Sequence, residues 1–157
     1  MKKVIMAFLA ASMLAGAAAG QSADKKADLS LNFGLTYDNE SEEIVNLTID
    51  ARAGFRLGKG VQISPEVMYA FAYGESVISP GVIFNYVARR AFFGGGLLVQ
   101  FRHDWWDNYV DAAVKINIGY AWRHVMVTAY YIGRFYTDVE TEIFGYHQLG
   151  FNIGYRF

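Results

Sequence analysis

Residues 44–58, "IVNLTIDARAGFRLG", alternate between apolar side chains and residues that are polar, charged or glycine. The odd positions from 45 to 57 are all apolar, and the even positions from 46 to 58 hold the other set. A period of two puts the sets on opposite faces of an extended chain, so the stretch predicts a β-strand. It exceeds the usual strand of about five or six residues and is long enough for the about 9–11 residues that a tilted membrane-crossing strand needs.

The same alternation recurs along the chain, which predicts eight strands and no helix after the amino-terminal segment. In the seventh stretch both faces carry bulky residues, and Thr128 and Arg134 mark the even positions as its polar face. Pro65 and Pro80 fall inside the third and fourth stretches, where each removes a ladder donor, so we expect a bulge or an irregular strand end. The predicted strands cover residues 27–37, 44–58, 61–73, 77–88, 91–102, 110–122, 125–136 and 146–157.

Side-chain volume decides which face points inward. Eight long antiparallel strands favour a closed barrel, whose interior is only just wide enough to be filled by side chains. The apolar faces carry too many large residues to fit there, whereas the other faces are rich in Gly, Ala, Ser, Thr and Asn. The apolar faces must therefore point outward into lipid. The sequence predicts an all-β fold, an eight-stranded antiparallel up-and-down transmembrane barrel.

The connections between the predicted strands alternate in length and charge. Those after the first, third, fifth and seventh strands are longer and hold only acids among their charged residues: Asp38, Glu40, Glu42, Glu43, Glu75, Asp104, Asp107, Asp138, Glu140 and Glu142. The others are tight and hold only basic ones: Lys59, Arg89, Arg90 and Arg123. Short turns on the periplasmic side and longer loops outside are typical of such barrels, so both termini are expected to be periplasmic. The acidic loops are either a solvated rim or a place where divalent cations bridge to lipopolysaccharide phosphates.

Aromatic residues gather near both predicted ends of the barrel. Rings with a polar edge suit the headgroup level of a membrane, so they indicate two girdles, although a scatter of an aromatic content of 17% is the simpler alternative. The girdle residues that we single out are Tyr37, Tyr73, Trp105, Trp106, Tyr120 and Trp122.

The amino-terminal segment has the layout of a secretory signal peptide. Lys2 and Lys3 precede an apolar run to about Leu14, and small residues follow. The run is too short for the about 20 residues of a membrane anchor helix. We assign residues 1–20 to the signal peptide and 21–157 to one barrel domain. Without Lys2 and Lys3, the 14 basic residues become 12 against 15 acidic ones, a net charge of −3 that argues against nucleic-acid binding. The chain has no cysteine, which excludes disulfides and thiol chemistry.

The last residues, "GFNIGYRF" (150–157), again place large apolar side chains on one face. With the signal peptide and the eight strands, this ending resembles the small bacterial outer-membrane β-barrels of the OmpA/OmpX type, also labelled porin-like. The resemblance covers the whole of residues 21–157. It implies a Gram-negative outer-membrane protein in contact with lipid and lipopolysaccharide. In that family the ending is the signal read by the barrel-assembly machinery, which here corresponds to Leu149, Phe151, Ile153, Tyr155 and Phe157.

Charged residues of both signs fall on the faces expected to line the lumen: Asp50, Arg52, Arg56, Glu66, Arg102, Asp111, Lys115, Arg134 and Arg156. Charges in a narrow interior are costly unless paired, so they predict a salt-bridge network that fills the lumen. Alternatively, they line a narrow solute path. The six basic groups outnumber the three acidic ones, so a leak would mildly prefer anions.

Catalytic chemistry has little support in the sequence. Ser76, His103 and Asp104 are the one combination that could approach a serine hydrolase triad. It lacks the His-x-Ser pattern of the lipid A deacylase barrels. We therefore expect no enzyme, no cofactor and no metal site. The predicted function is a structural, envelope-integrity role, with a small porin-like channel as the alternative and a loop-mediated interaction module third. The sequence leaves the oligomeric state open.

Overall fold

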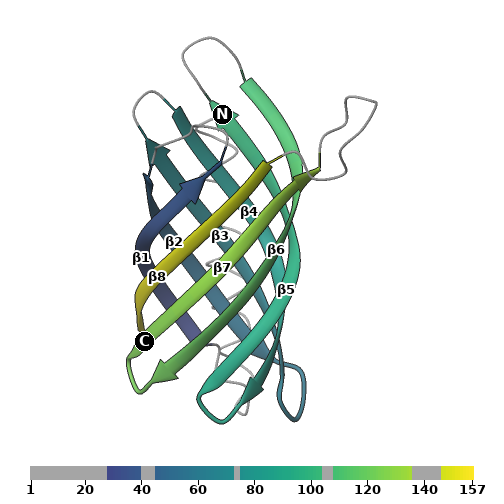
Figure 1. Ribbon diagram of the computed structural model, residues 1–157. Coiled ribbons are helices and arrows are strands. Elements are labelled where there is room, and N and C mark those ends of the chain that lie inside the picture. The colour runs from purple at the N-terminus through teal and green to yellow at the C-terminus, as the bar shows by residue number, and fades with distance from the viewer. Residues whose placement is uncertain (1–27, 40–44, 73–74, 104–107, 136–145) are drawn as a thin grey trace.

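The computed structural model describes residues 28–39, 45–72, 75–103, 108–135 and 146–157, which form a closed barrel of eight antiparallel strands (Figure 1). The predicted signal peptide, residues 1–20, lies outside the described residues. No helix in the described ranges is long and apolar enough to cross a membrane. The strands are β1 (Asp28–Asp38), β2 (Val45–Arg56), β3 (Val61–Ala72), β4 (Glu75–Ala88), β5 (Ala91–His103), β6 (Asn108–Trp122), β7 (Val125–Phe135) and β8 (Tyr146–Arg156).

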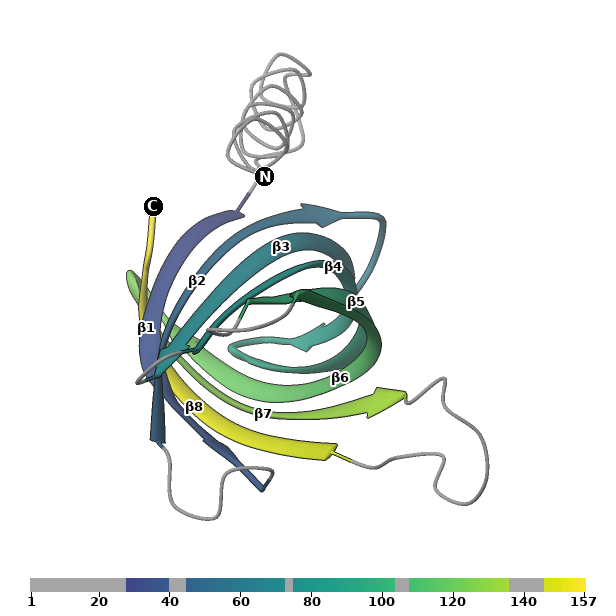
Figure 2. The same ribbon diagram turned by 90° about the horizontal axis from the view of Figure 1, so that it is seen from above.

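Neighbours in sequence are neighbours in the barrel, and β8 closes the sheet on β1 (Figure 2). Their pairing runs from Ser30 opposite Arg156 to Asp38 opposite Gln148. The backbone N–H of Phe157 then donates a hydrogen bond of 2.9 Å to the carbonyl oxygen of Leu29. Closure leaves no unpaired strand edge, which is the condition for placing a sheet in lipid.

The two faces of each strand divide as the period of two predicts. Large apolar side chains are exposed on the outer surface, whereas the alternate positions are buried inside the barrel. In β7, where the sequence pattern is weakest, Met126, Thr128, Tyr130, Ile132 and Arg134 are all buried, so the even positions face inward. The fold class predicted from the sequence is confirmed.

The expectation of a bulge or irregular strand end at the two prolines is wrong. Pro65 lies opposite Val82, and Pro80 lies opposite Val67, in an uninterrupted β3–β4 ladder. Pairing is lost only on the far side of each proline, between β2 and β3 at Pro65 and between β4 and β5 at Pro80, and the register is the same on both sides of each gap. The cause is that proline lacks only its own N–H, so one ladder can continue undisturbed.

Tight turns join β2 to β3, β4 to β5 and β6 to β7 at one end of the barrel, where β8 also ends (Figure 1). Arg89 and Arg123 stand at the first position of two-residue turns and have φ angles of 57° and 50°. Turns with left-handed residues match the twist of the paired strands, so they hold hairpins in register. We call this the short-turn end, and the opposite one the loop end.

The barrel interior contains more apolar bulk than the sequence pattern suggests. A cluster of buried residues packs inside the wall, formed by Met68, Ile83, Leu98, Ala113, Tyr130 and Ile132. The prediction of an interior made of small polar residues and a few charges is therefore incomplete. Apolar as well as polar side chains therefore occupy the interior, which in an eight-stranded barrel is only just wide enough for side chains.

Candidate functional site: the charged lumen

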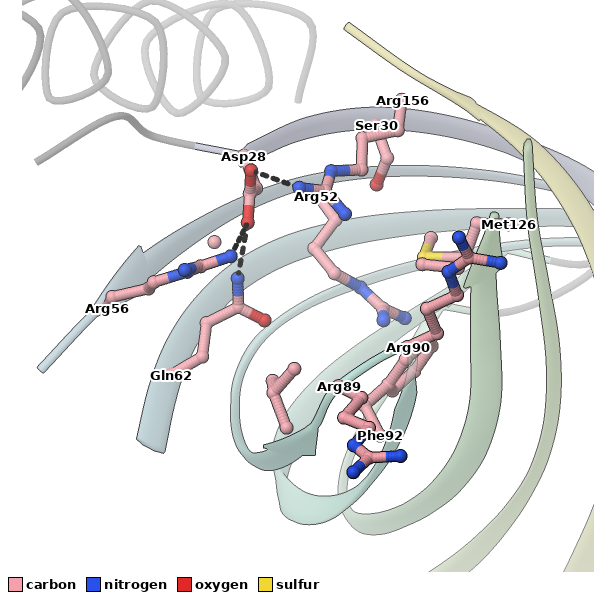
Figure 3. A pocket seen from close by; sticks show the side chains of 13 residues that line it. Asp28, Ser30, Arg52, Arg56, Gln62, Arg89, Arg90, Phe92, Met126 and Arg156 are labelled. Carbon is pink, nitrogen blue, oxygen red and sulfur yellow. Dashed lines mark hydrogen bonds and ion pairs between the residues drawn. The ribbon is translucent and has the colours of Figure 1, made fainter. Parts of the chain in front are cut away.

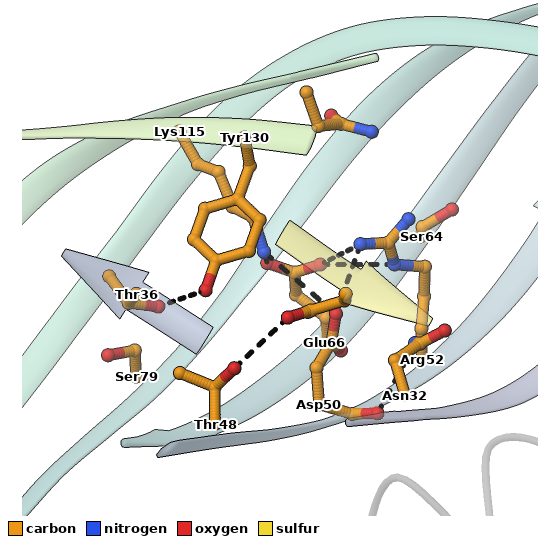
Figure 4. A network of polar contacts seen from close by, with 12 residues as sticks. Asn32, Thr36, Thr48, Asp50, Arg52, Ser64, Glu66, Ser79, Lys115 and Tyr130 are labelled. Carbon is orange, nitrogen blue, oxygen red and sulfur yellow. Dashed lines mark hydrogen bonds and ion pairs between the residues drawn. The ribbon is translucent and has the colours of Figure 1, made fainter. Parts of the chain in front are cut away.

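Four charged side chains meet in the middle of the barrel, and we call them the central cluster: Asp50 and Arg52 of β2, Glu66 of β3, and Lys115 of β6 (Figure 4). The Nζ atom of Lys115 lies 2.7 Å from Oε1 of Glu66 and 4.0 Å from Oδ2 of Asp50. The guanidinium of Arg52 lies 3.0 Å from Oε2 of Glu66 and 3.2 Å from Oδ2 of Asp50. Two acids and two bases thus balance.

Strand register and barrel closure bring these four groups together. Arg52 and Glu66 are direct partners across the β2–β3 ladder. Lys115 comes from β6, which stands opposite β2 in a ring of eight strands. All four side chains are buried, and Lys115 has no exposed surface. Removing such charges from water is compensated only by close pairing and further hydrogen bonds.

Tyr130 extends the central cluster toward β1. The Lys115 ammonium lies 4.6 Å from the centre of the Tyr130 ring, a cation–π arrangement. The Tyr130 hydroxyl is hydrogen-bonded to the hydroxyl of Thr36 (Figure 4). The Tyr130 ring lies over the backbone of Gly150, where a Cβ atom would overlap it. The cluster and the ring together join β1, β2, β3, β6 and β7 across the lumen.

A second polar group lies toward the loop end. Arg134 of β7 and Gln148 of β8 each donate a hydrogen bond of 2.6 Å to Oδ2 of Asp38 in β1. The sequence analysis assigned Asp38 to an acidic outer loop, which is wrong. Asp38 is buried as the last residue of β1, on the same even register as Asn32. That register was the signal that could have identified it as a lumen residue.

A third group lies at the short-turn end, around Asp28. Arg156 donates a hydrogen bond of 2.9 Å to Oδ1 of Asp28, and Gln62 donates one of 3.3 Å to Oδ2. The Arg56 guanidinium is 3.9 Å from the same carboxylate, and its side chain is 64% exposed. Arg56 is thus at the mouth of the barrel rather than deep in the lumen. Asp28 was missed from the sequence, although it too shares the inward even register of β1.

The remaining predicted lumen charges lie on the inward register of their strands. Arg102 in β5 and Asp111 in β6 are half-buried. With Asp28 and Asp38 added, five acids stand on the inward register of the described strands instead of the three counted from the sequence, against the same six bases, of which Arg56 lies at the mouth. The excess of basic groups that suggested a preference for anions is therefore smaller than predicted.

Uncharged polar side chains form further contacts between the charged groups. Asn117 donates to Asn85, which in turn donates to Ser64, over 3.0 and 3.1 Å. Thr48 donates to Asn152 over 3.0 Å. Some buried oxygens in the described part of the chain have no protein partner, among them Oε1 of Gln100 and Oδ1 of Asn32.

The structure describes two of the three residues in the catalytic combination considered from the sequence. Ser76 and His103 are partners across the β4–β5 ladder, but both stand on the outward register with Ile78 and Phe101. The His103 ring is 2.9 Å from Oδ1 of Asn108. Asp104 lies outside the described residues. Within the described ranges, no group of three or more His, Asp or Glu side chains could hold a metal ion.

The predicted girdle and the carboxyl-terminal residues lie on the outer surface as far as they are described. Tyr37 is exposed near the loop end, and Tyr120 and Trp122 are exposed near the short-turn end. Tyr73, Trp105 and Trp106 lie outside the described residues. The residues predicted to form the carboxyl-terminal assembly signal are exposed outward: Leu149, Phe151, Ile153, Tyr155 and Phe157.

Comparison with known proteins finds similar folds among solved structures. No protein-family model matches the chain, and no curated protein sequence matches it either. A designed transmembrane β-barrel is 9% identical, with a TM-score of 0.57 over 83% of this chain and 95% of that one. The amino-terminal barrel domain of OprF from Pseudomonas aeruginosa is 11% identical, with a TM-score of 0.55 over 85% and 100%. Neisserial surface protein A is 13% identical, with a TM-score of 0.53 over 83% and 94%. The fold is that of the small outer-membrane β-barrels, as the resemblance in sequence predicts.

Proposed function

We propose that this chain is an integral outer-membrane β-barrel with a structural role in envelope integrity, and that charged side chains close its lumen. The observation that carries the proposal is the central cluster. Lys115 extends from β6 to the carboxylates of Asp50 and Glu66 on β2 and β3, and Arg52 completes the pairing. A solute moving along the axis would have to separate these buried pairs, which costs several kcal/mol per uncompensated ion.

The outer surface supports a location in lipid. Large apolar side chains are exposed on all eight strands, for example Phe33, Phe84, Ile118 and Phe151. Monomeric soluble proteins rarely expose continuous apolar surface of more than a few hundred Å². An outward apolar band on a closed barrel suits contact with lipid and lipopolysaccharide.

Orientation and assembly belong to the same proposal. Residues 1–20 would direct secretion, and Phe157 with the outward residues of β8 would be recognised by the barrel-assembly machinery. The short turns would then face the periplasm with both chain termini, and the acidic loops would face outward. No enzymatic step and no cofactor are part of this function.

A small porin-like channel is the second candidate, because polar groups continue along the lumen beyond the central cluster. Buried oxygens of Asn32, Gln100 and Asn117 have no protein partner within the described part of the chain, and such groups suit water. In this alternative, the central cluster would open to let ions pass.

Conductance across planar lipid bilayers separates the two candidates. We expect the purified wild-type protein to add no conductance above that of protein-free bilayers. The double variant Glu66→Ala/Lys115→Ala removes the pair that crosses the lumen and should conduct, which shows that inserted barrels are detectable. Stable single-channel steps from the wild-type protein would favour the channel and contradict the closed lumen.

The envelope role needs a cellular measurement. Deleting the gene in the host should increase uptake of a hydrophobic dye, and expression of the wild-type chain should reverse the effect. The conducting double variant serves as the control, because it should restore the barrel in the membrane without restoring the closed lumen. Unchanged dye uptake in the deletion strain would contradict a role in envelope integrity.

A further inference from the structure

The short-turn end of the lumen opens into a pocket rich in arginine (Figure 3). The pocket has a volume of about 60 Å³. A cavity needs only about 10–15 Å³ by this kind of measure to hold one water, so the pocket has room for a small polyatomic ion. We call it the arginine pocket. One carboxylate and five guanidinium groups line it: Asp28, Arg52, Arg56, Arg89, Arg90 and Arg156.

The single carboxylate cannot balance these positive charges. Asp28 is shared between Arg156, at 2.9 Å, and Arg56, at 3.9 Å. Arg52 points toward the central cluster, where Asp50 and Glu66 compensate its charge. Arg89 and Arg90, in the turn from β4 to β5, have no ion-pair partner among the described residues.

We propose that the arginine pocket binds a water-soluble anion that carries a phosphate group. Guanidinium groups offer planar pairs of donors that match phosphate oxygens, and several converge here. Figure 3 shows Arg52 and Arg90 projecting into the same opening, with Ser30 and Gln62 beside it as polar neighbours. A cleft of one sign between apolar walls also concentrates the field, which raises the local concentration of anions.

The position of the pocket favours a soluble anion over a lipid headgroup. Ser30, Arg52 and Arg156 stand on the inward register of their strands. The apolar outer face, where lipid would lie, is formed by the alternate residues, such as Leu29 and Tyr155. A headgroup would have to bend around the barrel rim to reach the guanidinium groups, whereas a dissolved phosphate enters along the axis.

The inner end of the pocket lies at the central cluster. Arg52 is both a lining residue of the pocket and a member of the central cluster. On its way into the lumen, a phosphate bound in the pocket next to Arg52 would therefore contact the paired charges of Asp50, Glu66 and Lys115. In the closed barrel of the proposed function, on which this step rests, the arginine pocket is a binding site and not the entrance to a pore.

Calorimetric titration with inorganic phosphate tests the proposal on the full barrel in dodecyl maltoside at fixed salt. We expect saturable binding to the wild-type protein. The double variant Arg89→Asn/Arg90→Gln should bind at least about tenfold more weakly, since it removes two charged donors. Asp28→Asn should bind more tightly, because it releases Arg56 and Arg156 from their shared carboxylate.

Arg123→Asn is the matched control. Arg123 is also the first residue of a two-residue turn at the same end and also has a positive φ, but it does not line the arginine pocket. Asparagine tolerates that backbone conformation, so both turns should keep their shape. If Arg123→Asn and Arg89→Asn/Arg90→Gln lose phosphate affinity equally, the loss reflects the general surface charge of this end of the barrel, and the proposal is overturned.

Nanodiscs distinguish the soluble anion from a lipid. Phosphate affinity should be the same in phosphatidylcholine nanodiscs and in nanodiscs that contain phosphatidylglycerol. Loss of phosphate binding only in the anionic lipid, in the wild type but not in Arg89→Asn/Arg90→Gln, would show that headgroups fill the pocket and would contradict the assignment. Absence of phosphate binding to the wild type in any of these media would also overturn it.

Discussion

At the scale of single residues, Lys115 holds the interior charges in balance. Its ammonium contacts Glu66 directly and lies within ion-pair distance of Asp50, while its other side faces the Tyr130 ring. Without it, two buried carboxylates would share the one guanidinium of Arg52. A buried ion pair adds little compared with a well-packed apolar core, but breaking one leaves an uncompensated charge.

We therefore expect Lys115→Met to lower the free energy of unfolding by about 3–5 kcal/mol. Urea unfolding in detergent micelles, followed by tryptophan fluorescence, measures the change. The double variant Glu66→Gln/Lys115→Met leaves one acid, Asp50, with one base, Arg52, and should recover most of the loss. A Lys115→Met variant as stable as the wild type would mean that the central cluster contributes no net stability.

The close packing of Gly150 makes the stability of the barrel sensitive to a substitution at this position. A Cβ atom at this position would overlap the ring of Tyr130, which is itself fixed by Thr36 and Lys115. Gly150→Ala should cost about 1–3 kcal/mol of unfolding free energy, the usual range for overpacking. Gly58→Ala is the control, because an added Cβ there meets no atom within 4 Å. Equal urea midpoints for the two variants would contradict the close packing of Tyr130 on Gly150.

At the scale of strands, the sequence shows which side chains face the lumen much better than it shows which of those side chains contact one another. The period of two predicts that Asp50, Arg52 and Lys115 face inward, and they do. That Lys115 contacts Glu66, 49 residues away, depends on the register of every ladder between β3 and β6 and on the curvature of the closed sheet. No local pattern carries this information. The same limit explains the missed apolar cluster, since alternation says which residues face inward but not how much space they find.

The outward face of β5 provides a strand-level test of the lipid location. Leu97 lies in the middle of this strand and is 67% exposed. Leu97→Arg should cost about 2–4 kcal/mol if that position is at the bilayer midplane, whereas Val125→Arg, at the start of β7, should cost about 0–1. Urea unfolding from lipid vesicles measures both. Equal costs for the two positions would contradict a barrel that crosses the bilayer along its full height.

The ending of β8 is a second strand-level test. Phe157 is 73% exposed, and its ring packs edge-on against the exposed ring of Tyr155, with centroids 5.1 Å apart, so the folded barrel gains little from this side chain. If assembly machinery reads this residue, Phe157→Ala should reduce the amount of folded barrel in cell envelopes while leaving its urea midpoint unchanged. Heat-modifiable migration on gels measures the folded fraction. Phe93→Ala, an exposed ring on β5, is the control, and an equal decrease there would rule out a special role for the terminus.

At the scale of the whole molecule, the two ends of the barrel differ in chemistry. The short-turn end carries Arg56, Arg89, Arg90 and Arg156 around a single carboxylate, and it also holds the end of β8. The opposite end leads into the connections that the sequence fills with acids. We expect such a barrel to prefer one orientation in the membrane, because its two ends are in contact with different solutions and different lipid headgroups.

The absence of cysteine from the chain makes this orientation directly measurable. Arg123→Cys places a thiol in the β6–β7 turn at the short-turn end, and His103→Cys places one at the last residue of β5, toward the loop end. A membrane-impermeant maleimide added to intact cells should label His103→Cys and leave Arg123→Cys unlabelled, because the short turns face the periplasm in the proposed topology. Permeabilising the outer membrane should then expose Arg123→Cys to the reagent. The reverse labelling pattern would mean that the barrel has the opposite orientation, with the arginine pocket at the cell surface instead of in the periplasm.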